Sequence, residues 1–140
     1  MSARDELVTV LAPASWLAEV EGVEVLLVSV ELWKRGIVVH LAGLESELTD
    51  RLLREHRALM DRFGGIDPTP TEVPEPPYAV LGRMPLTIAD DVDTVYLPSS
   101  SSSGGGDTTW RTEWHFEPGV PEGASRLDVA IGADRLELPL

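Results

Sequence analysis

Hydrophobic and polar residues alternate along much of this chain with the period of two that is typical of β-strands. The clearest case is the stretch 110–116, where bulky side chains occupy every second position and charged residues lie between them. One predicted face holds Trp110, Thr112, Trp114 and Phe116, and the other holds Arg111, Glu113 and His115. We therefore expect a half-buried strand here, with the core of the protein around its aromatic face.

Two β-hairpins follow from the same pattern. Residues 23–33 carry valine and leucine on both alternating faces, which is typical of a central strand that is covered on both sides. The turn signal Lys34-Arg35-Gly36 and the apolar run 37–42 complete the first hairpin. Alternating residues in 127–131 and 136–140 predict the second. A shorter strand is expected at 7–11, at the edge of a sheet, with a helix over 3–11 as the alternative. Further short strands are expected at 78–81, 86–89 and 94–97.

Residues 46–63 depart from this period and predict an amphipathic helix of four to five turns. On a helical wheel the apolar residues and one histidine fall within one arc, and charged residues occupy the rest. Ser46 or Thr49 can cap the start of the helix, and Gly64-Gly65 can end it. The arc consists of Leu48, Leu52, Leu53, His56, Leu59, Met60 and Phe63.

These elements predict a single domain that spans residues 1–140. Prolines crowd residues 66–77, which we interpret as an extended linker, and the serines and glycines of 98–109 predict a flexible loop. About eight short strands with one inserted helix and no alternation of strand and helix favour an antiparallel β-sandwich. The expected fold class is mainly β, an immunoglobulin-like sandwich with the helical insertion at 46–63.

The C-terminal half carries a resemblance in its strand and turn spacing. Ile88-Ala89-Asp90-Asp91, Val95-Tyr96, a long polar loop, Phe116-Glu117-Pro118 and the closing hairpin follow one another in 86–140. This order resembles uncharacterised bacterial immunoglobulin-like β-sandwich domains. The resemblance implies a fold and brings no functional residues with it.

Composition narrows the classes of partner. The formal net charge of −13 repels nucleic acid and anionic membrane surfaces, so we expect neither as a partner. Cysteine is absent, which excludes disulfides and thiolate sites. No signal peptide or membrane-spanning run is visible, so the cytoplasm is the expected compartment. Ten arginines to one lysine indicate the coding bias of a GC-rich bacterial genome. A protein partner or a homo-oligomer stays open, and no cofactor is indicated.

Candidate sites for chemistry are few. Asp90, Asp91 and Asp93 could offer carboxylate oxygens to Ca²⁺, but their spacing is not that of a calcium loop, and turn-forming aspartates are the better interpretation. No motif for nucleophilic catalysis, phosphate binding or zinc occurs. The alternative function is a small hydrolase or ligand-binding protein. Its site would lie at this acidic turn or under the serine-rich loop, with His40 or His115 converging on it.

The helix and the segment after it are the least expected parts of a sandwich. The favoured interpretation is that the apolar helix face belongs to the core. The competing hypothesis is that this face, or the adjacent segment after it, forms a protein or self-association interface. The expected function of the protein is that of a protein-binding or scaffold module without enzymatic activity. The candidate interface residues are Leu52, Leu59, Phe63, Tyr78, Arg83 and Met84.

Overall fold

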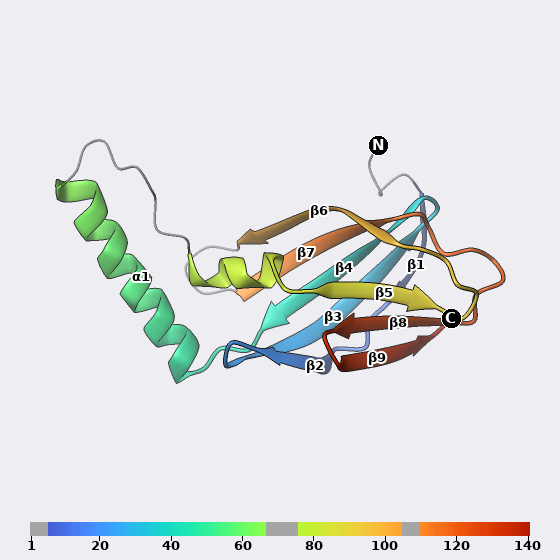
Figure 1. The fold of residues 1–140 in the computed structure, drawn as a ribbon, viewed down its shortest axis with the longest axis horizontal. Helices are drawn as coiled ribbons and strands as arrows, with labels where there is room; N and C mark the ends of the chain where they lie inside the picture. Colours follow the sequence, from blue (N-terminus) through green and yellow to red (C-terminus); the bar gives the residue numbers. More distant parts are fainter. Residues whose placement is uncertain (1–5, 67–75, 105–109) are drawn as a thin grey trace.

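The chain folds as an antiparallel β-sandwich with one long helix at its end (Figure 1). A computed structural model describes residues 6–66, 76–104 and 110–140. The expected mainly β fold with one inserted amphipathic helix is confirmed. The elements are β1 (Leu7–Leu11), β2 (Ser15–Val20), β3 (Val23–Trp33), β4 (Gly36–Gly43), α1 (Glu47–Ile66), the 3-10 helix η1 (Pro77–Gly82), β5 (Leu86–Asp90), β6 (Leu97–Gly104), β7 (Trp110–Glu117), β8 (Arg126–Ile131) and β9 (Asp134–Pro139).

The larger sheet is organised around the long strand β3. Its order is β1-β3-β4-β7-β6, and β2 also pairs with β3. The C-terminal half of β3 pairs with β1 and its N-terminal half with β2, because the chain turns away between them at Ala14, which has a positive φ of 46°. The predicted hairpin of β3 and β4 is confirmed, with Trp33 opposite Gly36 at its closed end.

The smaller sheet has the order β5-β8-β9 and covers part of the larger one, while η1 covers another part on the same side (Figure 1). Between these layers lies one continuous cluster of buried apolar side chains. The predicted aromatic face of β7 is confirmed: Trp110, Trp114 and Phe116 are all buried. The predicted C-terminal hairpin is confirmed as β8 and β9.

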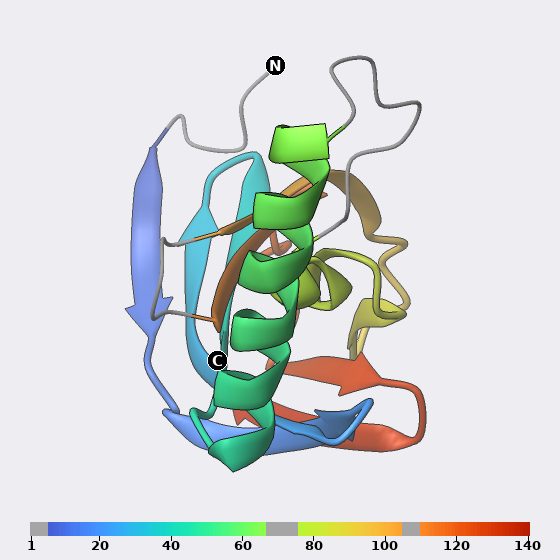
Figure 2. The same cartoon turned by 90° about the vertical axis from the view of Figure 1, so that its left-hand side faces the viewer.

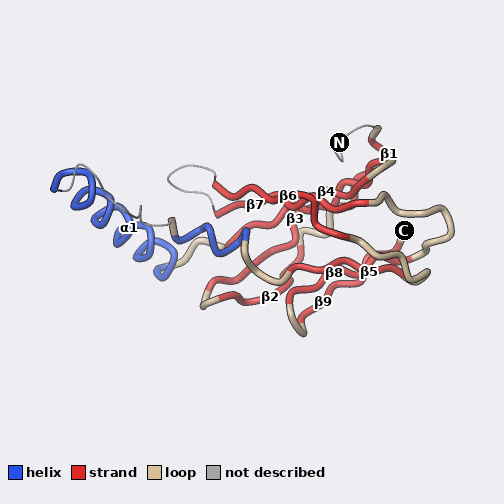
Figure 3. The backbone as a smooth tube through the Cα atoms, turned by 45° about the horizontal axis from the view of Figure 1, so that its top comes forward, coloured by secondary structure: helices blue, strands red, loops and turns tan. Residues whose placement is uncertain are grey.

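The helix α1 stands across one end of the sandwich (Figure 2) and extends beyond the strands (Figure 3). It begins close to the expected position and extends to Ile66 rather than to residue 63. Of the proposed linker 66–77, residues 67–75 lie outside the described residues, whereas Ile66 belongs to α1 and Pro77 to η1.

Two local predictions are wrong. Residues 78–81 form η1 instead of a strand, because Pro76 and Pro77 set a helical start and Trp114 Nε1 donates a hydrogen bond of 3.0 Å to the Leu81 carbonyl. Residues 98–104 were expected to be a loop but belong to the edge strand β6, which pairs with β7. Backbone pairing at an edge needs no apolar side chain, so five serines permit it. Residues 105–109 of that loop lie outside the described residues.

Two further differences from the prediction concern the start of one strand and the presence of another. Residues 94–96 were expected within a strand, but β6 begins only at Leu97 because Asp90 binds the backbone of the preceding turn. The strand β2 was not predicted, since the pattern of residues 15–20 is short and is interrupted by the turn at Glu21-Gly22.

Candidate interaction surface

The first turn of α1 is fixed to the sandwich by its cap and by close packing. The Ser46 backbone N–H donates to Thr49 Oγ1 at 2.7 Å, and the Thr49 N–H donates to Ser46 Oγ at 3.3 Å. This reciprocal pair identifies Ser46 as the cap that the sequence left open. A Cβ on Gly22, in the turn between β2 and β3, would lie 2.7 Å from Leu48 Cδ2. The base of the helix therefore rests directly on this turn.

The apolar face of α1 changes from packed to exposed along its length. Leu52 and Leu53, near the base, are half-buried and pack against the core cluster. Leu59 and Met60, two turns further on, expose 49% and 39% of their surfaces. These four residues lie within one arc of the helix because they are separated by one, six, seven or eight positions. The packed face therefore continues into a face that the described part of the protein leaves open.

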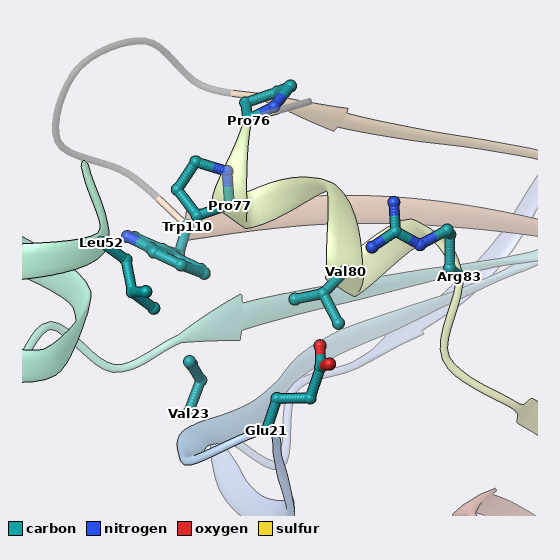
Figure 4. A pocket seen from close by; sticks show the side chains of 8 residues that line it. All are labelled: Glu21, Val23, Leu52, Pro76, Pro77, Val80, Arg83 and Trp110. Carbon is teal, nitrogen blue, oxygen red and sulfur yellow. The ribbon is translucent and has the colours of Figure 1, made fainter. Parts of the chain in front are cut away.

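A groove lies between the base of α1, the turn before β3 and η1 (Figure 4). It has a volume of about 280 Å³. Trp110 belongs to its lining, and the Trp110 ring meets that of Tyr78 edge to face with centroids 6.3 Å apart. The lining residues are Glu21, Val23, Leu52, Pro76, Pro77, Val80, Arg83 and Trp110.

The groove combines apolar walls with a few polar groups. The Trp110 indole is 2% exposed, and within the described residues its Nε1–H has no hydrogen-bond acceptor. Glu21 and Arg83 bring opposite charges to the lining. An apolar contact surface with a polar border is typical of the sites at which proteins bind one another.

The structure brings several of the candidate interface residues together and separates others. Leu52 and Arg83 both line the groove, and Tyr78 packs on the Trp110 ring beside it. Leu59 lies further along α1. Met84 is 4% exposed and belongs to the core, so its side chain is not at this surface. Phe63 lies within α1, and its side chain is outside the described part of the structure.

The first carboxylate of the acidic turn, Asp90, accepts hydrogen bonds from other groups of the protein. Asp90 Oδ1 accepts the N–H groups of Val92 at 2.9 Å and Thr94 at 3.1 Å, and Oδ2 accepts the Tyr96 hydroxyl at 2.7 Å. Burial opposes ionisation of Asp90, but these bonds and the Thr94 hydroxyl outweigh it and lower its pKa to about 2. Burial and the contact with Asp90 both raise the pKa of Tyr96.

The second aspartate of the turn ties it to the start of β8. Asp91 accepts hydrogen bonds from the Ser125 hydroxyl and, at 2.9 Å, from the Ser125 N–H, and both lower the pKa of Asp91. Asp93 has a positive φ of 59°, which suits a turn aspartate. Within the described ranges no three acidic or histidine side chains are placed to hold a metal ion. The geometry gives the calcium hypothesis no support.

Two of the histidines, His40 and His115, each pair with a glutamate. His40 Nε2 lies 2.6 Å from Glu31 Oε2, and His115 Nε2 lies 3.0 Å from Glu113 Oε1. Both pairs lie on the outer face of the larger sheet, where His40 is opposite Glu113 in the register of β4 and β7. His56 is half-buried on α1. These pairs stabilise a polar sheet face and line none of the groove beside η1.

A second exposed apolar surface was not indicated by the sequence pattern. The edge strand β1 exposes 49% of Leu7, 68% of Val8 and 48% of Val10. Alternation predicts which residues share a face of a strand, but both faces of β1 are open because it lies outside the smaller sheet. An uncharged edge such as this can accept a further strand.

Comparisons with models of protein families, with curated protein sequences and with solved structures find no match to this chain. The candidate surface therefore rests on its own geometry. None of the described helices has the length and apolar character needed to cross a membrane.

Proposed function

We propose that this protein is a non-enzymatic protein-binding module and that the open apolar face of α1 is its contact surface. One observation carries the proposal. The face that packs against the core at Leu52 and Leu53 continues to Leu59 and Met60, which expose 49% and 39% of their surfaces. Leaving two large apolar side chains on a long helix in water forgoes free energy that a partner would recover, at about 25 cal/mol per Å² of apolar area buried.

The rest of the molecule supports a binding role. The sandwich presents the helix at one end, and the cap at Ser46 together with the packing of Leu48 on Gly22 fixes its base. A preorganised helix loses little conformational entropy on binding, which favours affinity. The groove beside η1 borders the same base and would extend the contact.

Photo-crosslinking tests this proposal. A benzophenone amino acid replaces Leu59 in one variant and Ala58, which is exposed and lies outside the apolar arc of α1, in the matched control. We expect adducts from position 59, in a lysate of the source organism or with the purified chain, that position 58 does not give. Equal adducts from both positions, or none from position 59, would contradict the proposal.

A further inference from the structure

We propose that the partner of α1 is the α1 helix of a second copy of this chain, packed antiparallel to it. This inference rests on the proposed function, because it names the occupant of the same apolar face. The supporting observation is the order of charges and apolar residues along the helix. When two copies of the helix run antiparallel, opposite charges and apolar residues face one another.

The helix is the electrically neutral part of a strongly acidic protein. Residues 47–66 contain four arginines and four carboxylates, so the formal charge of −13 resides in the rest of the chain. Two copies that approach through their sandwiches bring like charges together, which costs free energy. Two copies that meet through α1 bring together segments without net charge.

The apolar residues of α1 have the spacing of a helix-pairing seam. Leu52, His56 and Leu59 recur at intervals of four and three positions, which keeps them on one line along the helix. On one flank of this line lie Leu53 and Met60, seven positions apart. On the other flank lie Glu55 and Arg62, also seven positions apart and both exposed.

In an antiparallel pair, each flank of one helix lies along the same flank of the other helix, which runs in the opposite direction. When Leu59 of one copy faces His56 of the second copy, Leu53 lies across from Met60 of the second copy, so apolar residues meet. Glu55 lies across from Arg62 of the second copy on the other flank, and the symmetry makes each contact twice. A two-fold axis near residues 57–58 therefore satisfies the apolar seam and the charges together.

A parallel pair lacks this complementarity. It would set the seam residues against their own equivalents and leave Glu55 and Arg62 without opposite charges across the seam. It would also place both sandwiches at the same end of the pair, because each is joined to the base of its helix (Figure 1). The antiparallel pair puts them at opposite ends of helices about 30 Å long, where screening by salt reduces their repulsion.

Sedimentation velocity on the full chain tests this arrangement with charge reversals. The wild type is expected to form a dimer as its concentration rises through the micromolar range. Glu55→Arg and Arg62→Glu each replace two attractions by two repulsions, so each variant alone should dimerise about tenfold more weakly. Asp61→Arg, with the same change in charge on the outer side of α1, should dimerise as well as the wild type.

Mixing the two variants gives the decisive result. A Glu55→Arg copy and an Arg62→Glu copy again have opposite charges at both contacts, so an equimolar mixture should recover dimerisation close to that of the wild type. Loss of local helix stability, including the weak Arg51–Glu55 ion pair at 3.9 Å, would not be recovered by mixing. A mixture no better than its components would overturn the proposal.

Two other outcomes also overturn the self-pairing. If the wild type stays monomeric up to millimolar concentration, self-pairing through α1 is excluded. Adducts from position 59 to a different protein would still support the proposed function. A dimer that is unaffected by both reversals and is lost in Val10→Lys would place the contact at the edge strand β1 instead.

Discussion

The Tyr96 hydroxyl donates a hydrogen bond of 2.7 Å to Asp90 Oδ2, six residues earlier in the chain. Tyr96 is 7% exposed and Asp90 is 9% exposed, so the bond lies largely out of water. It closes the turn that follows β5, while the other oxygen of Asp90 holds the backbone of the same turn. Asp90 thus acts as a structural carboxylate whose ionised form the fold stabilises.

This arrangement predicts a loss of stability in acid. The folded pKa of Asp90 is about 2 and its ordinary value is 3.8, so the folded state favours the ionised form. The resulting stabilisation is complete above pH 4 and is lost as the pH falls towards 2; it amounts to about 2 kcal/mol. Urea unfolding between pH 2 and pH 6 measures it. Asp90→Asn should flatten this part of the profile, whereas Asp93→Asn should retain it.

Substitution by alanine should have very different effects on the free energy of unfolding at Gly119 and at Gly123. A Cβ on Gly119 would lie 2.3 Å from the Lys34 carbonyl oxygen, whereas a Cβ on Gly123 meets nothing within 4 Å. Gly119→Ala must displace the backbone after β3 and should cost about 2 kcal/mol or more. Gly123→Ala should change the free energy of unfolding by less than about 1 kcal/mol. Similar values for both variants in denaturant titrations would show that Gly119 does not lie against the backbone of Trp33 and Lys34.

Three leucines should report how tightly α1 is joined to the core. Leu27 is fully buried, Leu52 is half-buried and Leu59 is 49% exposed. Leu27→Ala should cost about 2–5 kcal/mol, Leu52→Ala about 1–2, and Leu59→Ala less than about 0.5. Thermal and urea unfolding at low protein concentration, where association is minimal, give these values. If Leu52→Ala costs no more than Leu59→Ala, the base of the helix is not part of the core.

The hydrogen bonds of the acidic turn lead us to expect that calcium does not change the stability of the protein. Both oxygens of Asp90 and both oxygens of Asp91 accept hydrogen bonds from the protein, so a cation would have to displace those donors. The melting temperature of the protein in millimolar Ca²⁺ should equal its melting temperature in the presence of a chelator. A rise of several degrees with Ca²⁺ but not with Mg²⁺ would contradict this account of the turn.

The sequence predicted the elements whose side-chain period is strong. The alternating aromatic residues of β7 and the apolar arc of α1 were both visible, because burial on one side imposes a period on the sequence. The edge strand β6 gave no signal in the hydrophobic pattern, since its backbone pairing with β7 needs no apolar side chain. The 3-10 helix η1 was also mistaken for a strand because a tertiary contact, from Trp114 to Leu81, determines its path.

The candidate surface was predictable only in part. The wheel placed Leu52 and Leu59 on one face but could not show that the sandwich covers the first and leaves the second open. Met84 looked like an interface residue next to Arg83, yet it turns inward, because neighbours in a bend point in different directions. The Glu21 side of the groove comes from a turn distant in sequence from Arg83, which no local pattern reveals.

The distance between two copies of α1 tests the central claim most directly. The chain has no cysteine, so Ala58→Cys offers one exposed thiol for a nitroxide label on the outer side of the helix. Double electron–electron resonance then reports the distance between labels on different copies. Two helices packed 8–10 Å apart, with the two-fold axis near the label, predict a narrow distribution below about 30 Å. A concentrated sample that gives no defined distance, or one centred beyond about 45 Å, would contradict pairing through α1.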